Sequence, residues 1–153
     1  MTHKLLLPVV FSLLFFSSCQ TTGQGDAVKT AEAEVFKIHD EVMPRIDDVM
    51  KLRKQLSQRI AATDSTLAGD KNTPSESLRT DEDKEQATRL NRRLAQADSL
   101  MMDWMSNYKG DTLAILKPEQ AIQYLDAEKQ KITDVQKKVT GSIADAKQFL
   151  GVK

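Results

Sequence analysis

A single cysteine among 153 residues excludes a disulfide bond within this chain. Aromatic residues make up only 5% of the sequence, which argues against a β-sandwich or a β-barrel. Six glycines and four prolines leave few turns, so the chain must form a small number of long elements. Neither sign of charge dominates, since 22 Lys and Arg residues stand against 22 Asp and Glu residues. No nucleic-acid-binding surface is therefore expected.

Motifs of known catalytic sites are missing as well. The sequence contains no HExxH, no GxSxG and no phosphate-binding loop. His39 is the only histidine after the first eighteen residues, so few general bases are available. We expect a protein that is not an enzyme and that binds no cofactor.

The first eighteen residues have the order of an export signal. Lys4 lies in a short basic start, and residues 5–16 form an apolar run that is too short to span a bilayer as a helix. Small residues follow and lead directly to Cys19. This order resembles the signal of bacterial lipoproteins, although Phe16 is a poorer match than the usual leucine. The resemblance implies removal of residues 1–18 and acylation of Cys19; the alternative is an ordinary secretory signal that leaves Cys19 as a free thiol.

Acylation would place the mature chain on a membrane, because two or three acyl chains anchor a protein stably. Residues 19–25 are small, polar and uncharged after Cys19, and they predict a flexible tether. By analogy with lipoprotein sorting in Gram-negative bacteria, Gln20 is compatible with the outer membrane. No acidic run precedes Asp26, which favours a protein that faces the periplasm.

Apolar residues recur at spacings of three and four over residues 26–68, which predicts one long amphipathic helix ended by Gly69. Pro44 lies inside this pattern and cannot donate a hydrogen bond to the carbonyl of Asp40. The helix either continues with a kink or ends near Val42 and restarts at Pro44. Because the apolar stripe keeps its phase across Pro44, we predict one kinked helix.

A second helix is predicted to end at residue 109, with Gly110 as its C-terminal cap. Two segments resemble its start, Thr73–Glu76 with proline at the first helical position and Thr80–Asp83. The second helix therefore covers 74–109 or 80–109.

A third helix is predicted over 118–150, with Pro118 in its first turn. Glu128 falls on the apolar stripe of this helix and needs either a partner or a place at the rim. Gly141 weakens the helix interior, and it either allows the close approach of another backbone or marks a bend. Three amphipathic helices with short connections predict an all-α, antiparallel three-helix bundle over residues 26–153.

Two small groups of side chains are candidates for a binding site. His39 and Met43 lie four residues apart and so share a helix face, and imidazole with several thioethers can bind copper(I). Methionines at helical spacing also fill cores. Trp104, in the segment Met101–Met105, either lines a ligand groove or belongs to the core with its N–H bonded to a side chain.

Two short blocks of the sequence are distinctive, His39–Pro44 and Met101–Met105. With Tyr124-Leu125, Glu128 and the segment 142–150, they resemble a family of small lipoproteins of Gram-negative bacteria often labelled "viral A-type inclusion protein". The resemblance extends over residues 35–150. It implies a lipoprotein with a helical bundle, and it implies no activity and no functional residue beyond the acylated Cys19.

The sequence as a whole predicts a lipid-anchored protein of the envelope that acts as a structural element or through protein contacts. Its expected partners are the membrane, through the anchor, and either a second copy of the chain or another envelope protein. The alternative function is a periplasmic module that binds a ligand or copper near His39 and Met43.

Overall fold

The computed structural model describes residues 21–67 and 73–152. The expected signal peptide, the acylation of Cys19 and the role of Gly69 concern residues outside these ranges. Within them, the chain is helical and contains no strand, so the predicted all-α class is confirmed. None of the helices described is long and apolar enough to cross a membrane.

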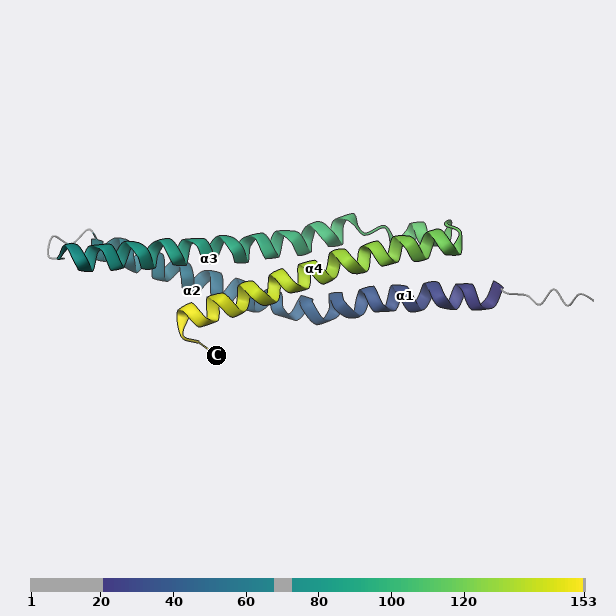
Figure 1. Ribbon diagram of the computed structural model, residues 1–153, viewed down its shortest axis with the longest axis horizontal. Helices are drawn as coiled ribbons and strands as arrows, with labels where there is room; N and C mark the ends of the chain where they lie inside the picture. Colours follow the sequence, from purple (N-terminus) through teal and green to yellow (C-terminus); the bar gives the residue numbers. More distant parts are fainter. Residues whose placement is uncertain (1–20, 68–72, 153) are drawn as a thin grey trace, which may run out of the picture.

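Three long helical segments pack side by side in alternating directions, as predicted (Figure 1). Helices α1 (Thr21–Val42) and α2 (Ile46–Leu67) follow one another along one side of the rod. Helix α3 (Pro74–Asn107) runs back along them, and α4 (Pro118–Leu150) lies across both. Helix α1 packs mainly against α4 and α2 mainly against α3, while α4 also contacts α3 and α2.

A single 3₁₀ turn, η1 (Met43–Arg45), separates α1 from α2. The N–H of Ile46 donates to the carbonyl of Met43, three residues earlier in the chain. In an α-helix it would donate to the carbonyl four residues earlier. Pro44 causes this change because it has no N–H and its ring crowds the preceding turn. The chain thus stays helical through Pro44, with a local tightening of the winding.

The start of α1 differs from the sequence prediction. Residues 21–25 were expected to belong to the flexible tether, but they form the first turn of the helix, which begins at Thr21. Once the packed part of a helix has formed, each further residue adds a hydrogen bond at little cost. No proline lies in this segment to stop the extension.

The start of α3 confirms the first of the two predicted alternatives. The side chain of Thr73 accepts a hydrogen bond from the N–H of Glu76, and the carboxylate of Glu76 accepts one from the N–H of Thr73 at 2.9 Å. This capping box satisfies two backbone donors at the helix end, and Pro74 occupies the first helical position.

The end of α3 was predicted wrongly. Tyr108, with an extended backbone, is the C-terminal cap, while Gly110 begins a separate 3₁₀ turn, η2 (Gly110–Ala114). The helix ends here because the N–H of Lys109 donates to the hydroxyl of Tyr124 at 2.6 Å instead of continuing the helical ladder.

Helix α4 has the predicted bounds. One glycine lies inside the helix and a second glycine caps its C-terminus. An added Cβ at Gly141 would meet no atom within 4 Å, so the first of the two predicted alternatives, the close approach of another backbone, is wrong. Gly151 caps the helix in the left-handed region with φ of 68°, which favours glycine.

The apolar core follows the rod over most of its length and stops before one end. Its fully buried larger side chains come from all four helices: Val35, Val42, Val49, Leu56, Leu94, Met101, Leu125, Ile132 and Val139. Helix α4 ends part-way along the rod, so the far part of α2 and α3 forms a two-helix hairpin (Figure 1).

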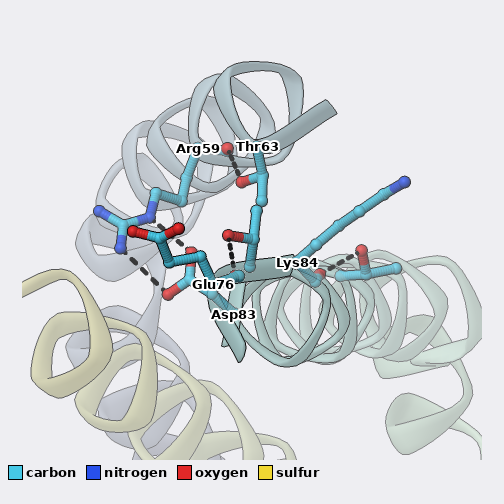
Figure 2. A network of polar contacts seen from close by, with 7 residues as sticks. Arg59, Thr63, Glu76, Asp83 and Lys84 are labelled. Carbon is cyan, nitrogen blue, oxygen red and sulfur yellow. Dashed lines mark hydrogen bonds and ion pairs between the residues drawn. The ribbon is translucent and has the colours of Figure 1, made fainter. Parts of the chain in front are cut away.

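Polar contacts join the two helices of this hairpin end. Beyond Leu56 and Ala87, Thr63 is the only buried residue among the side chains described there. Figure 2 shows Arg59 of α2 reaching Asp83 of α3, and Thr63 donating its hydroxyl to the carbonyl of Arg59 at 2.6 Å. Lys84 also forms an ion pair with Asp64.

Candidate functional site

Near the end of the rod that holds the start of α1, large side chains bridge α1 and α3. The backbones of these two helices come close at few positions, and aromatic rings fill the space between them. Phe36 meets Tyr108 at 5.3 Å between ring centroids, edge to face. The ring centroid of Trp104 lies 5.4 Å from that of Tyr108 and 5.7 Å from that of His39. Tyr124 of α4 completes the cluster at 6.0 Å from Tyr108.

His39 makes two polar side-chain contacts that the sequence did not predict. Its Nδ1 lies 2.9 Å from an oxygen of Asp40, and its Nε2 lies 3.4 Å from the sulfur of Met105 on α3. The imidazole is largely covered, with 19% of its side chain exposed, whereas Asp40 is open to solvent. The structure thus joins the two candidate groups that the sequence left apart, His39 and the segment Met101–Met105.

The methionines divide between two environments. Met101 is fully buried and fills the core. This agrees with the interpretation that methionines at helical spacing are core residues. Met43 and Met105 are half-buried, while Met50 and Met102 are 54% and 43% exposed. Met43 and Met105 also pack against the core, so a core role fails to account only for Met50 and Met102.

The half-buried and exposed methionines lie on one side of the pair formed by α1–α2 and α3. Cross-helix contacts fix the register of this pair, since Ser57 meets Asn91, Arg53 meets Asp98 and His39 meets Met105. The intervening positions on both helices, at spacings of three and four, therefore face each other. We call this surface the methionine face; its members are Phe36, His39, Met43, Met50, Met102 and Met105.

Helix α4 covers the opposite side of this helix pair. It bonds to a different stripe of α1 through Glu34 and Glu41, which meet Lys129 and Gln136. Phe36 and Met43 come two residues after these glutamates, which is about 200° around a helix. Helix α4 thus does not cover the methionine face, and no other described element packs over it.

Trp104 is a core residue, with 6% of its surface exposed. The expected hydrogen bond from its N–H to a side chain is wrong, because the buried Nε1 has no partner among the described residues. Trp104 also borders a groove of about 550 Å³ between α3 and α4.

Glu128 is buried on the other wall of that groove, and its carboxylate accepts a hydrogen bond from Lys131 at 2.7 Å. The predicted need for a partner on the apolar stripe is thus confirmed. The sequence could not identify the partner as Lys131 rather than a residue of another helix.

Tyr108 stands between two acidic side chains. Its hydroxyl donates to Glu32 at 3.2 Å. Burial first, and then the charge of Glu32, raise the pKa of Tyr108 well above its ordinary value of 10.0, and Glu128 adds to the effect. The phenol therefore stays neutral and remains a donor.

No three His, Cys, Asp or Glu side chains are grouped as a metal site would require in the part of the chain that the structure describes. The soft donors are arranged differently, as one imidazole beside thioethers. Comparisons with protein-family models, with curated proteins and with solved structures give no match.

Proposed function

We propose that this protein is a lipid-anchored helical rod of the bacterial envelope that acts through contacts with another protein. The start of α1 supports this proposal best. The helix begins at Thr21, two residues after Cys19, and it begins at one end of the rod (Figure 1). Acyl chains on Cys19 would attach almost directly to a stiff element.

The length of the rod would let an anchored protein reach far from the membrane surface. Helices α1 and α2 have 22 residues each, so at 1.5 Å per residue the two span roughly 70 Å. The hairpin of α2 and α3 lies at the opposite end from the start of α1 (Figure 1). A rod of this kind would hold its far end well away from a membrane surface. We place it on the outer membrane, facing the periplasm, and in the family of small lipoproteins that its two blocks resemble.

The methionine face is the surface that we assign to the partner. Phe36, Met50 and Met102 expose 38%, 54% and 43% of their surface there. Methionine adapts its shape to different apolar surfaces. Helix α4 already lies against the other side of the same helix pair, so an amphipathic helix of another envelope protein fits the remaining side.

Replacement of the cysteine tests the anchor. We expect Cys19→Ser to move the protein from the membrane fraction to the soluble periplasmic fraction and to abolish labelling by a fatty acid. Ser18→Ala, which keeps the thiol, serves as the matched control. If Cys19→Ser still sediments with the outer membrane, anchoring by acylation is wrong.

Site-specific photocrosslinking in intact cells tests the partner. We expect a photoreactive residue at Met50 or Met102 to give one discrete adduct. The control position is Arg92, which is exposed on α3 but lies off the methionine face. An adduct of twice the monomer mass would replace the proposed partner by a second copy of the chain. Equal labelling at all three positions, or none, would remove the assignment of this face.

A further inference from the structure

We propose that His39, Met105 and Met43 form a binding site for a soft monovalent metal ion, copper(I) or its redox-inert analogue silver(I). This inference concerns one end of the methionine face and does not depend on the lipid anchor. It starts from the contact between an imidazole nitrogen and a thioether sulfur on different helices.

The spacing of the two donor atoms suits one shared ion. Zinc, which serves as a guide to the bond lengths of a small ion, lies about 2.0 Å from histidine nitrogen and about 2.3 Å from cysteine sulfur in proteins. With bond angles between tetrahedral and trigonal, these lengths place the two donor atoms roughly 3.5–3.7 Å apart. Nε2 of His39 and Sδ of Met105 are already 3.4 Å apart, so little movement is needed.

The hydrogen bond on the other side of the ring sets the direction of the free electron pair. A carboxylate only accepts hydrogen bonds, so the contact of 2.9 Å assigns a hydrogen to Nδ1 of His39, donated to Asp40. In the neutral ring, Nε2 then carries a lone pair and turns it toward Met105. Carboxylates orient metal-binding histidines in this way.

Two electron-pair donors that face each other at 3.4 Å leave a position that one positive group can share. A proton on Nε2 would provide one, by making the imidazolium a donor to sulfur. A metal ion would provide the other, and a thioether is a ligand that soft ions such as copper(I) accept. A titration with the metal ion distinguishes these two cases.

Two further methionines are near in sequence. Met43 comes one helical turn after His39 and is half-buried, which makes it the third donor. Met102 comes three residues before Met105 and is exposed, so it provides a first contact for an arriving ion. The rings of Phe36 and Trp104 lie 6.0 and 5.7 Å from that of His39 and shield the site.

Trp104 also supplies the readout, because it is the only tryptophan of the chain. We would titrate the full-length Cys19→Ser protein with copper(I) under anaerobic reducing conditions and repeat the titration with silver(I). The serine is required because a free thiol would bind either ion more tightly. We expect quenching of tryptophan fluorescence that saturates at one ion per chain, and retention of copper(I) against a chromogenic chelator.

Two variants test the ligands, and two matched variants serve as controls. We expect Met105→Leu and His39→Ala each to weaken binding at least tenfold. Met101→Leu and Met50→Leu should leave affinity unchanged, since Met101 is in the core and Met50 lies two turns beyond Met43. Met105→Leu keeps the apolar volume, so it carries the test if His39→Ala unfolds.

Several results would overturn the site. Absence of saturable binding by both ions would reject the site. Binding that survives Met105→Leu with unchanged affinity would move the ion elsewhere. X-ray absorption of the copper(I) complex should show nitrogen and sulfur neighbours together, and a spectrum without sulfur would also reject the proposal.

Discussion

Arg59 and Asp83 connect α2 to α3 through two parallel hydrogen bonds, one from Nε at 2.7 Å and one from an Nη at 3.0 Å. The pair lies at the hairpin end, where the described side chains include no buried apolar residue. The hydrogen bonds and the charge of Asp83 raise the pKa of Arg59. A two-bond fork of this geometry fixes direction as well as distance.

Loss of this fork should weaken the hairpin locally. We expect Arg59→Ala to lower the free energy of unfolding by about 0.5–1 kcal/mol, because the pair is partly exposed and a solvated ion pair contributes little. Urea denaturation would measure the change, and amide exchange should accelerate in residues 60–65. Arg89→Ala, which removes a pair with Glu85 inside α3, is the control and should leave that exchange unchanged. Unaltered exchange in Arg59→Ala would refute a local role.

The capping box at the start of α3 should make stability depend on acid. Hydrogen bonds from the backbone and side chain of Thr73 lower the pKa of Glu76 from its ordinary value of 4.5. A lowered folded-state pKa contributes stability above pH 4.5 that is lost as pH falls through the folded-state value. We expect Glu76→Gln to be less stable than the parent at pH 7 and equally stable at pH 2–3, in thermal melts. Glu82→Gln, on the same helix, should show a smaller difference; an equal one would contradict the assignment.

Gly141 inside α4 and Gly151 at its C-terminal cap should respond in opposite directions to alanine. Gly141 is helical with free space around it, so Gly141→Ala should stabilise the protein by up to about 1 kcal/mol. Gly151 has a positive φ, and Gly151→Ala should destabilise it by about 1 kcal/mol. Chemical denaturation of the two variants makes the comparison. Destabilisation by Gly141→Ala would mean that this part of α4 tolerates no side chain.

The neutral phenol of Tyr108 should make stability fall in alkali. Its raised pKa in the folded state favours folding up to the ordinary value of 10.0, and this contribution is lost as pH rises further toward the folded-state value. We expect Tyr108→Phe to lose less stability than the parent between pH 9 and pH 11.5. Denaturation at each pH gives the difference, and phenolate absorbance should show one tyrosine that ionises only on unfolding. Parallel losses in the two proteins would contradict the burial effect.

The sequence correctly predicted those helix ends that are set by residues close together in the chain. The Thr73–Glu76 capping box and Pro118 each involve residues close together in the chain, so their patterns could be read directly. The end of α3 is set by the hydroxyl of Tyr124, fifteen residues ahead on another helix, and no spacing rule predicts that bond. Gly110 had the right composition for a cap, and tertiary contact overrode it.

The candidate site likewise has one part that the sequence predicted and another that depends on tertiary contacts. The shared helix face of His39 and Met43 follows from their spacing. The contact between His39 and Met105 joins residues 66 positions apart and depends on the register of two antiparallel helices. Sequence periodicity gives each stripe separately, and only pairs such as Arg53 with Asp98 align one stripe with the other. The unpaired N–H of Trp104 could not be foreseen, because buried indoles ordinarily find a partner.

The pairing of α1 with α4 has a consequence for the order of folding. Glu34 and Lys129 meet across 95 residues, whereas Arg59 and Asp83 meet across 24. Contacts between distant segments form late, because the chain between them must first be brought to order. Of the four described α-helices, α1 comes first in the chain and finds its main partner last. While the chain folds, the apolar stripe of α1 therefore stays uncovered until α4 packs against it.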